Sequence, residues 1–231
     1  MKRMAPGRIL DAGRGMRPTL AGPLLTGALL AAVAGWVDTL GFVALHGVFA
    51  AHVTGNFVLL GTELAGQGGD IAPKLLVLPA FVVGVASAAM VHALQRTTRP
   101  QLLWFQAVAL ACFLGAGMRA DTLLAACAGA FAMGVQNAHC RLSFSAMGAT
   151  TAMTGNVTQM VLDAMAAAGL LAADRTLARR RLLGTLWPVA GFAAGCLGGG
   201  LACLAWSFWA LLVPIAALGV LGLHAQKGSA A

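Results

Sequence analysis

The residues of this chain that could take part in chemistry are polar residues inside long apolar segments. Asp38 is the only acid between Asp11 and Glu63. A carboxylate inside a membrane segment is costly and usually functional, as a proton site, a cation site or the partner of a cation. The alternative is that Asp38 lies at the membrane interface, where it is solvated or caps a helix end. We expect a functional role.

A second group of candidates is the motif Thr-Gly-Asn (TGN), which occurs at Thr54–Asn56 and again at Thr154–Asn156. Gly and Asn are poor helix-interior residues, and Thr and Asn suit a helix N-terminus. Each motif therefore predicts the start of a short helix, over Phe57–Leu64 and Val157–Ala168. A helix N-terminus offers free N–H groups and the positive end of the dipole, so both motifs could contact an anion. A structural cap at an ordinary turn is the alternative.

The two TGN motifs belong to a longer internal repeat with three landmarks in each copy. The matching segments are Gly35–Asp38 with Gly134–Asn137, Val53–Val58 with Met153–Thr158, and Phe81–Gly84 with Phe192–Gly195. The order is kept and the offset drifts smoothly, which is what duplication followed by loop insertions leaves behind.

Small residues recur at every fourth position in corresponding segments of the two copies. The stripes are Gly27, Ala31 and Gly35 with Ala126, Ala130 and Gly134, and Ala80, Gly84 and Ala88 with Gly191, Gly195 and Gly199. Such a stripe forms a helix face on which a neighbouring backbone can approach closely. Asp38 and Asn137 lie three residues beyond their stripes, so both are expected to point into the bundle.

Other polar residues near the motifs complete the candidate site. Asn137 keeps the shape of Asp38 without its charge, so we expect Asp38 to titrate or bind a cation and Asn137 only to hydrogen-bond. His52 could join a cavity, although a structural histidine is more common. Arg141 could neutralise Asp38 or an anion, or reach the headgroups. The predicted solute- or ion-binding residues are Asp38, His52, Thr54, Asn56, Asn137, Arg141, Thr154 and Asn156.

The composition places these residues in an all-α membrane protein. The 231 residues are 59% hydrophobic and 10% charged, whereas soluble domains carry about a quarter charged residues. Most of the uncharged runs reach the ~20 residues that a helix needs to cross a bilayer. The net charge of +8 comes from cations between these runs, a pattern that sets membrane orientation, so we expect no nucleic-acid partner. No strand-like alternation predicts a barrel.

The predicted organisation is a polytopic bundle of two diverged repeats. Residues 1–19 are expected to be a disordered basic cytoplasmic tail, 20–118 the first repeat, 119–224 the second, and 225–231 a short tail. The first apolar run has no cleavage site, so it is interpreted as an uncleaved span. Two arrangements stay open: six spans plus two re-entrant segments with inverted copies, or eight spans with parallel copies. Both satisfy the positive-inside rule.

The residues also resemble a known family. Gly35-x-x-Asp38, then a linker, then His52–Asn56 and an apolar Leu-Leu-Gly, is similar to the YoaK-like family of bacterial integral membrane proteins. His46 departs from the small residue expected at that position. The resemblance implies a small multi-span inner-membrane protein with no established activity, and it supplies no catalytic residues.

These features favour a secondary transporter or permease for a small polar or anionic solute, bound between the two TGN helices. The alternative is a non-transporting membrane subunit that assembles with other membrane proteins. No nucleophile or acid–base constellation occurs, so no enzyme activity and no cofactor are expected, and the histidine spacing predicts no metal site. The expected partners are the lipid bilayer and the solute or ion. The substrate, the coupling ion and the formation of a homo-oligomer stay open.

Overall fold

The computed structural model describes residues 21–67, 69–95, 99–143, 150–151 and 153–229. Within these ranges the chain is helical and contains no strand, as an all-α protein requires. The main helices are α1 (Ala21–Ala44), α2 (Gly55–Thr62), α3 (Ile71–Gln95), α4 (Arg99–Met118), α5 (Thr122–Ser143), α6 (Met153–Ala168), α7 (Arg175–Trp206) and α8 (Leu212–Ser229). The expected tail 1–19 lies outside the described residues, and α8 continues past residue 224 to Ser229.

The long helices have the length and composition of membrane spans. In the described part of the chain, four stretches qualify: Leu24–Ala44, Ile71–Leu94, Pro100–Met118 and Arg175–Lys227. The last contains two helices, α7 and α8, separated by a short 3-10 turn that begins at Ser207, where φ is 48°. These apolar helices fit a membrane-embedded protein.

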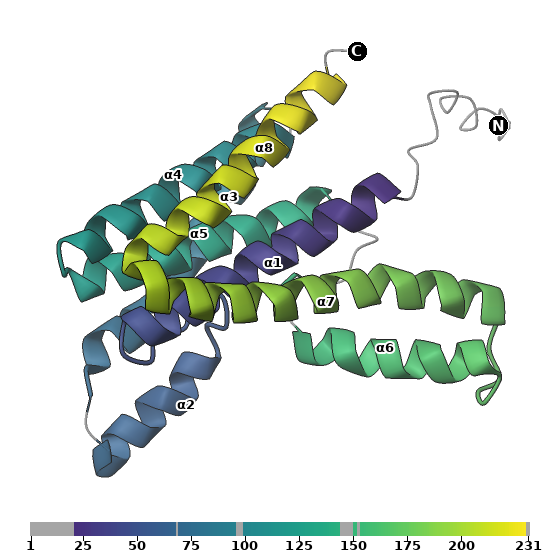
Figure 1. The fold of residues 1–231 in the computed structure, drawn as a ribbon, viewed down its shortest axis with the longest axis horizontal. Helices are drawn as coiled ribbons and strands as arrows, with labels where there is room; N and C mark the ends of the chain where they lie inside the picture. Colours follow the sequence, from purple (N-terminus) through teal and green to yellow (C-terminus); the bar gives the residue numbers. More distant parts are fainter. Residues whose placement is uncertain (1–20, 68, 96–98, 144–149, 152, 230–231) are drawn as a thin grey trace, which may run out of the picture.

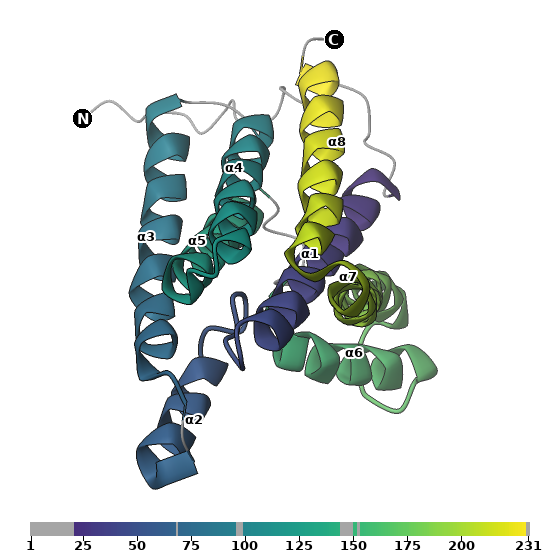
Figure 2. The same ribbon diagram turned by 60° about the vertical axis from the view of Figure 1, so that its left-hand side comes forward.

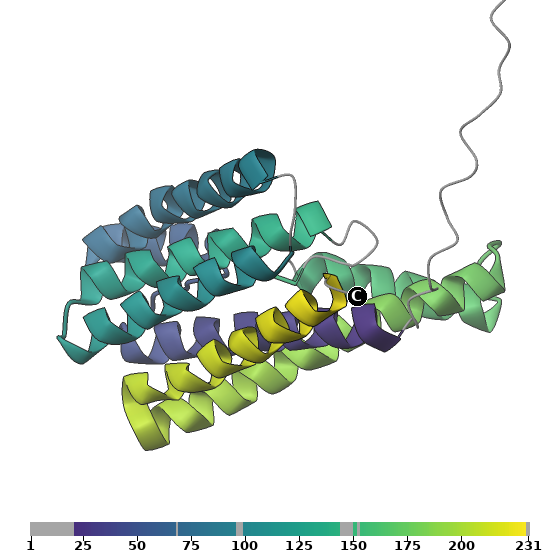
Figure 3. The same cartoon turned by 90° about the horizontal axis from the view of Figure 1, so that it is seen from above.

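The six longest helices form a bundle in which chain direction alternates (Figures 1 and 3). Helices α1, α4 and α7 run in one direction and α3, α5 and α8 in the other. Both the start of α1 and the end of α8 lie at the same end of the bundle. The short helices α2 and α6 lie outside the bundle, with α2 next to α3 and α6 beside the first half of α7 (Figures 1 and 2).

Helix pairs approach closely through the small-residue stripes. Helix α1 packs mainly on α7, and α3 packs mainly on α5. A Cβ added to Gly35 would collide with the carbonyl oxygen of Phe192, and one added to Gly84 with that of Phe131. Equivalent collisions would occur at Gly134, Gly191, Gly195 and Gly199. The contacts confirm that these stripes are packing faces, because only a missing side chain lets the backbones come so close.

Helix α5 lies at the centre and carries a buried polar network. Gln136 is fully buried, and its Nε2 donates to the carbonyl of Leu30 in α1 at 2.8 Å. Gln106 of α4, also fully buried, donates to Gln136 Oε1 at 2.6 Å. Because α5 is covered by α1, α3 and α4, it can carry these polar side chains in the interior of the bundle.

The two short helices begin at the TGN motifs, as the sequence predicts. Helix α2 begins at Gly55 and ends at Thr62, and a single π-helical turn over Glu63–Gln67 follows it, with Gly66 at φ of 90°. Helix α6 begins at Met153 and is amphipathic and longer than α2. Glu63 at the end of α2 forms an ion pair with Lys74 of α3, and both side chains are almost completely buried. This pair fastens α2 to the bundle.

Candidate functional site

Asp38 forms hydrogen bonds with the segment that leads into the first TGN motif. It lies near the end of α1 and is 5% exposed, so the expectation that it points inward agrees with the structure. Its Oδ1 accepts hydrogen bonds from the backbone N–H groups of Ala51 at 2.8 Å and of His52 at 3.1 Å. The carboxylate thus satisfies two backbone donors that the chain reversal leaves without a helical partner. Whether Asp38 also titrates stays a prediction.

Asn56 of α2 also forms hydrogen bonds with this segment. Its Oδ1 accepts from the N–H of Phe49 at 2.9 Å, and its Nδ2 donates to the carbonyl of Phe49 at 2.8 Å. Both ends of the amide are therefore bound within the loop, and the side chain is 2% exposed. These two bonds give Asn56 a structural role in the loop, and its contact with a solute stays a prediction. The turn before this segment contains His46 with φ of 54°, a left-handed conformation that glycine adopts most readily.

Asn137 binds the segment before the second TGN motif, as Asp38 binds the segment before the first. Its Nδ2 donates to Thr151 Oγ1 at 3.0 Å. Asp38 and Asn137 therefore each bind the segment about 14 residues further on, one through backbone N–H groups and the other through a hydroxyl. The pair of contacts differs chemically because a carboxylate only accepts, whereas an amide also donates.

The start of α2 does not present the free N–H groups that the motif predicts. The N–H groups of Gly55, Asn56 and Phe57 donate to the carbonyls of His52, Val53 and Thr54, respectively. Thr54 itself has helical φ and ψ, and its side chain makes no capping bond. A turn of chain thus precedes the helix and uses these donors. A solute at this end would meet the side chain of Thr54 and the dipole of the helix, which is a weaker anion site.

One cavity nevertheless brings the two TGN segments together. This TGN cavity has a volume of about 410 Å³ and is lined by Thr54 of the first motif and Thr154 of the second. His52, Asn137 and Thr151 add further polar groups, and Leu78 and Phe81 of α3 form an apolar wall. The volume lies within the ~300–1,000 Å³ range of small-molecule sites. The described polar groups of its lining are hydroxyls, an amide and an imidazole, with no carboxylate among them.

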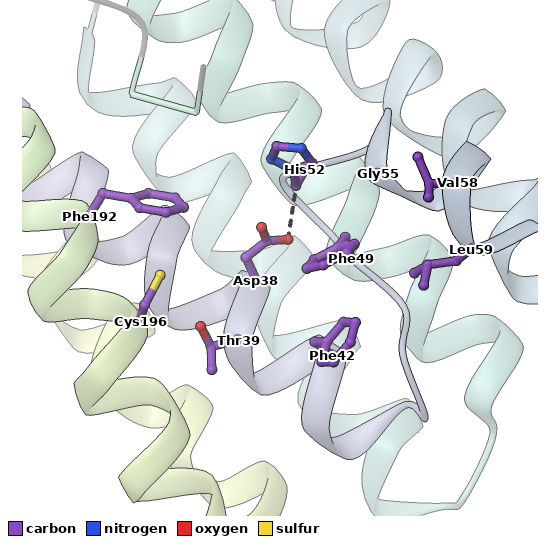
Figure 4. A pocket seen from close by; sticks show the side chains of 10 residues that line it. All are labelled: Asp38, Thr39, Phe42, Phe49, His52, Gly55, Val58, Leu59, Phe192 and Cys196. Carbon is purple, nitrogen blue, oxygen red and sulfur yellow. Dashed lines mark hydrogen bonds between the residues drawn. The ribbon is translucent and has the colours of Figure 1, made fainter. Parts of the chain in front are cut away.

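A second cavity lies on the other side of His52. This aromatic cavity, of about 460 Å³, contains Asp38 among Phe42, Phe49, Phe192 and Cys196 (Figure 4). The rings of Phe42 and Phe49 are 4.7 Å apart between centroids, and those of Phe49 and His52 are 5.6 Å apart. His52 lines both cavities, which are therefore neighbours.

The predicted site residues thus divide between several places. Thr54, Thr154, Asn137 and His52 line the TGN cavity, and His52 and Asp38 line the aromatic cavity. Arg141 is exposed in the last turn of α5 and forms no ion pair with Asp38.

Asn156 lines neither cavity. It is 8% exposed, and its Nδ2 donates to Met153 Sδ at 3.8 Å. Both Asn156 and Asn56 are buried in the first turn of their helices, but Asn56 bonds to the preceding loop whereas Asn156 bonds to Met153 of its own helix.

Several contributing residues were missed by sequence reasoning. Thr151 bonds to Asn137, and Phe49 bonds to Asn56. Thr151 stands 100 positions after Ala51, the same offset as between the two TGN motifs, and that offset was a signal for its role. Asp163 of α6 is 5% exposed, seven residues after Asn156, and Glu63 stands seven residues after Asn56. That repeated spacing was a signal for a matched pair of buried acids.

The sequence comparisons place the chain in a family. The sequence model of a family described as a protein of unknown function, DUF1275, matches residues 26–224. The chain belongs to the DUF1275 family. The match covers both TGN motifs and all eight main helices in whole or in part. Membership agrees with the expected absence of an established activity, and the likeness to the YoaK-like family stays a resemblance. No curated protein and no solved structure matches the chain.

Proposed function

We propose that this DUF1275 protein is a permease for a small polar solute that binds in the TGN cavity. The observation that carries the proposal is that segments 100 positions apart in the chain contribute Thr54 and Thr154 to a single cavity of about 410 Å³. Interrupted helices at membrane depth are tolerated where they line a cavity, and transporters place substrates at such helix ends.

The arrangement of the helices supports inverted repeats. In the proposed correspondence, α1 to α4 match α5 to α8, and each helix runs opposite to its counterpart (Figure 1). The contacts follow the same relation: α1 packs on α7, and α5 packs on α3. Six helices then cross the membrane, while α2 and α6 extend from the centre toward opposite faces. This is the geometry from which alternating access commonly arises.

The lining of the TGN cavity indicates the class of solute. Its polar side chains are Thr54, Thr151, Thr154, Asn137 and His52, which are hydroxyls, an amide and an imidazole. They offer both donors and acceptors, so a neutral polar solute can be bound on several sides. The first turns of α2 and α6 add the positive ends of two helix dipoles, which favours a small anion over a cation.

Solute entry into proteoliposomes tests the proposal. Vesicles with and without the purified protein are mixed with glycerol, urea, sodium formate or sodium nitrate, and their volume is followed by stopped-flow light scattering. We expect the protein to accelerate the entry of at least one of these solutes. Entry rates equal to those of empty vesicles for all four would reject this solute class and favour the membrane-subunit alternative.

A further inference from the structure

The aromatic cavity contains a carboxylate inside otherwise apolar walls. Among the described residues, the polar side chains that line it besides Asp38 are those of Thr39, His52 and Cys196. The remaining walls come from Phe42 and Phe49, the α2 residues Val58 and Leu59, and Phe192 of α7. A ligand that matches this cavity has an apolar body and one polar or charged group.

The charge of Asp38 is not neutralised by the described part of the chain. No described lysine, arginine or histidine side chain forms an ion pair with its carboxylate. The titratable groups that face the cavity beside it are the imidazole of His52 and the thiol of Cys196. Two backbone N–H groups stabilise one carboxylate oxygen, yet a buried anion without a counter-ion is costly. A cation supplied from outside would relieve this cost.

The aromatic rings beside Asp38 suit an organic cation. Phe42, Phe49 and His52 form a continuous row of rings, and Phe192 lies on the opposite side of the carboxylate (Figure 4). Ring faces attract ammonium groups, most strongly where water is excluded. An inorganic ion is a poorer match, because Ca²⁺ takes about 6–8 oxygen ligands and no cluster of metal-ligating residues occurs among the described residues.

We propose that the aromatic cavity binds an organic ammonium ion, with its nitrogen at Asp38 and its apolar part against Phe42, Phe49 and Phe192. The volume of about 460 Å³ suits a small arylalkyl amine. The site shares His52 with the TGN cavity but is otherwise lined by different described residues, and the proposal does not depend on transport.

Binding of phenethylammonium to the full-length protein in detergent tests this site, with 2-phenylethanol as the neutral counterpart. Isothermal titration calorimetry should show one ammonium ion per chain and at least about tenfold weaker binding of the alcohol. Asp38→Asn keeps an oxygen for the N–H groups of Ala51 and His52, and it should weaken ammonium binding at least about tenfold. Asp163→Asn removes a buried acid outside the cavity and should leave the affinity unchanged.

A second pair of variants keeps Asp38 in place. Val58 lines the cavity and is 70% exposed, so substitution there should preserve the fold. Val58→Lys puts an ammonium at the rim and should weaken phenethylammonium binding at least about tenfold, whereas Val58→Met should not. The proposal is overturned if the wild type does not bind the ammonium, or if amine and alcohol bind alike. The proposal is also overturned if a folded Asp38→Asn protein loses less than about tenfold in phenethylammonium affinity. If Asp38→Asn does not fold, the same criterion applies to Val58→Lys.

Discussion

Thr54 and Thr154 stand 100 positions apart in the chain and line the same cavity. The sequence predicts a solute between the two TGN helices, and the structure adds which side chains of the motifs line one cavity. The two motifs lie close together because α1 and α5 run in opposite directions (Figure 1). The chain that follows each helix therefore approaches the centre of the bundle from a different end. The proposed function rests on this juxtaposition.

The proposed inverted arrangement predicts on which side of the membrane residues 119 and 227 lie. In a cysteine-free background, Arg119→Cys and Lys227→Cys should react with a membrane-impermeant thiol reagent from opposite faces. The reason is that four helices (α5, α6, α7 and α8) lie between them, of which α6 does not cross. With eight spans, both positions would lie on the same face. Labelling of both cysteines from one face would therefore contradict the inverted copies.

Close packing of α1 on α7 predicts a strong difference between two glycines of one helix. Gly195→Ala places a Cβ against the carbonyl oxygen of Ala32, whereas a Cβ at Gly184 meets nothing within 4 Å. We expect Gly195→Ala to lower the free energy of unfolding by about 1–3 kcal/mol, the usual cost of overpacking. Gly184→Ala should be neutral or stabilising by up to ~1 kcal/mol. Thermal unfolding in detergent measures both, and equal melting temperatures would contradict the packing.

The buried ion pair between Glu63 and Lys74 predicts that a second substitution restores the stability lost by the first. Lys74→Met leaves the carboxylate of Glu63 buried without a counter-ion and should cost about 3–5 kcal/mol. The double variant Lys74→Met/Glu63→Gln removes both charges and should recover most of this loss. Thermal melts of the wild type, Lys74→Met, Glu63→Gln and the double variant form a double-mutant cycle. Additive losses would show that the pair contributes no coupling.

Part of this architecture could be predicted from the sequence because it depends on local rules. Gly and Asn in apolar segments marked the starts of α2 and α6, and glycines four apart marked the faces that pack. The partners of these faces could not be predicted, since the contact of Gly35 with Phe192 joins segments 157 residues apart. The two-sided binding of Asn56 to Phe49 was also missed, because it depends on how the loop folds back.

The loop contact of Asn56 predicts an effect on stability that is separate from solute binding. Asn56→Ala leaves the part-buried N–H and carbonyl of Phe49 without this partner, at a cost of about 1–3 kcal/mol. Asn56→Asp keeps the acceptor and loses the donor, so its loss should be partial in a thermal melt. An Asn56→Ala protein as stable as the wild type, with weakened solute entry, would return this residue to the binding site.

The electrostatics of the TGN cavity predict how selectivity can be changed. Asn137→Asp adds a negative charge to a lining whose described residues include no carboxylate, at the position that corresponds to Asp38. The variant should slow the entry of formate and nitrate more than that of glycerol or urea, because a charge repels an anion strongly in a cavity of low dielectric. Equal effects on all four solutes would indicate that the cavity does not sense charge.

The central claim is that solute passes through the TGN cavity, and one pair of variants measures it most directly. Thr154→Trp fills the cavity from its lining, whereas Thr158→Trp places the same side chain one turn further along α6, where residue 158 is exposed and lines neither cavity. In light-scattering assays of proteoliposomes, Thr158→Trp should retain the wild-type rate of solute entry and Thr154→Trp should lose it. A folded Thr154→Trp protein that transports at the wild-type rate would contradict the account.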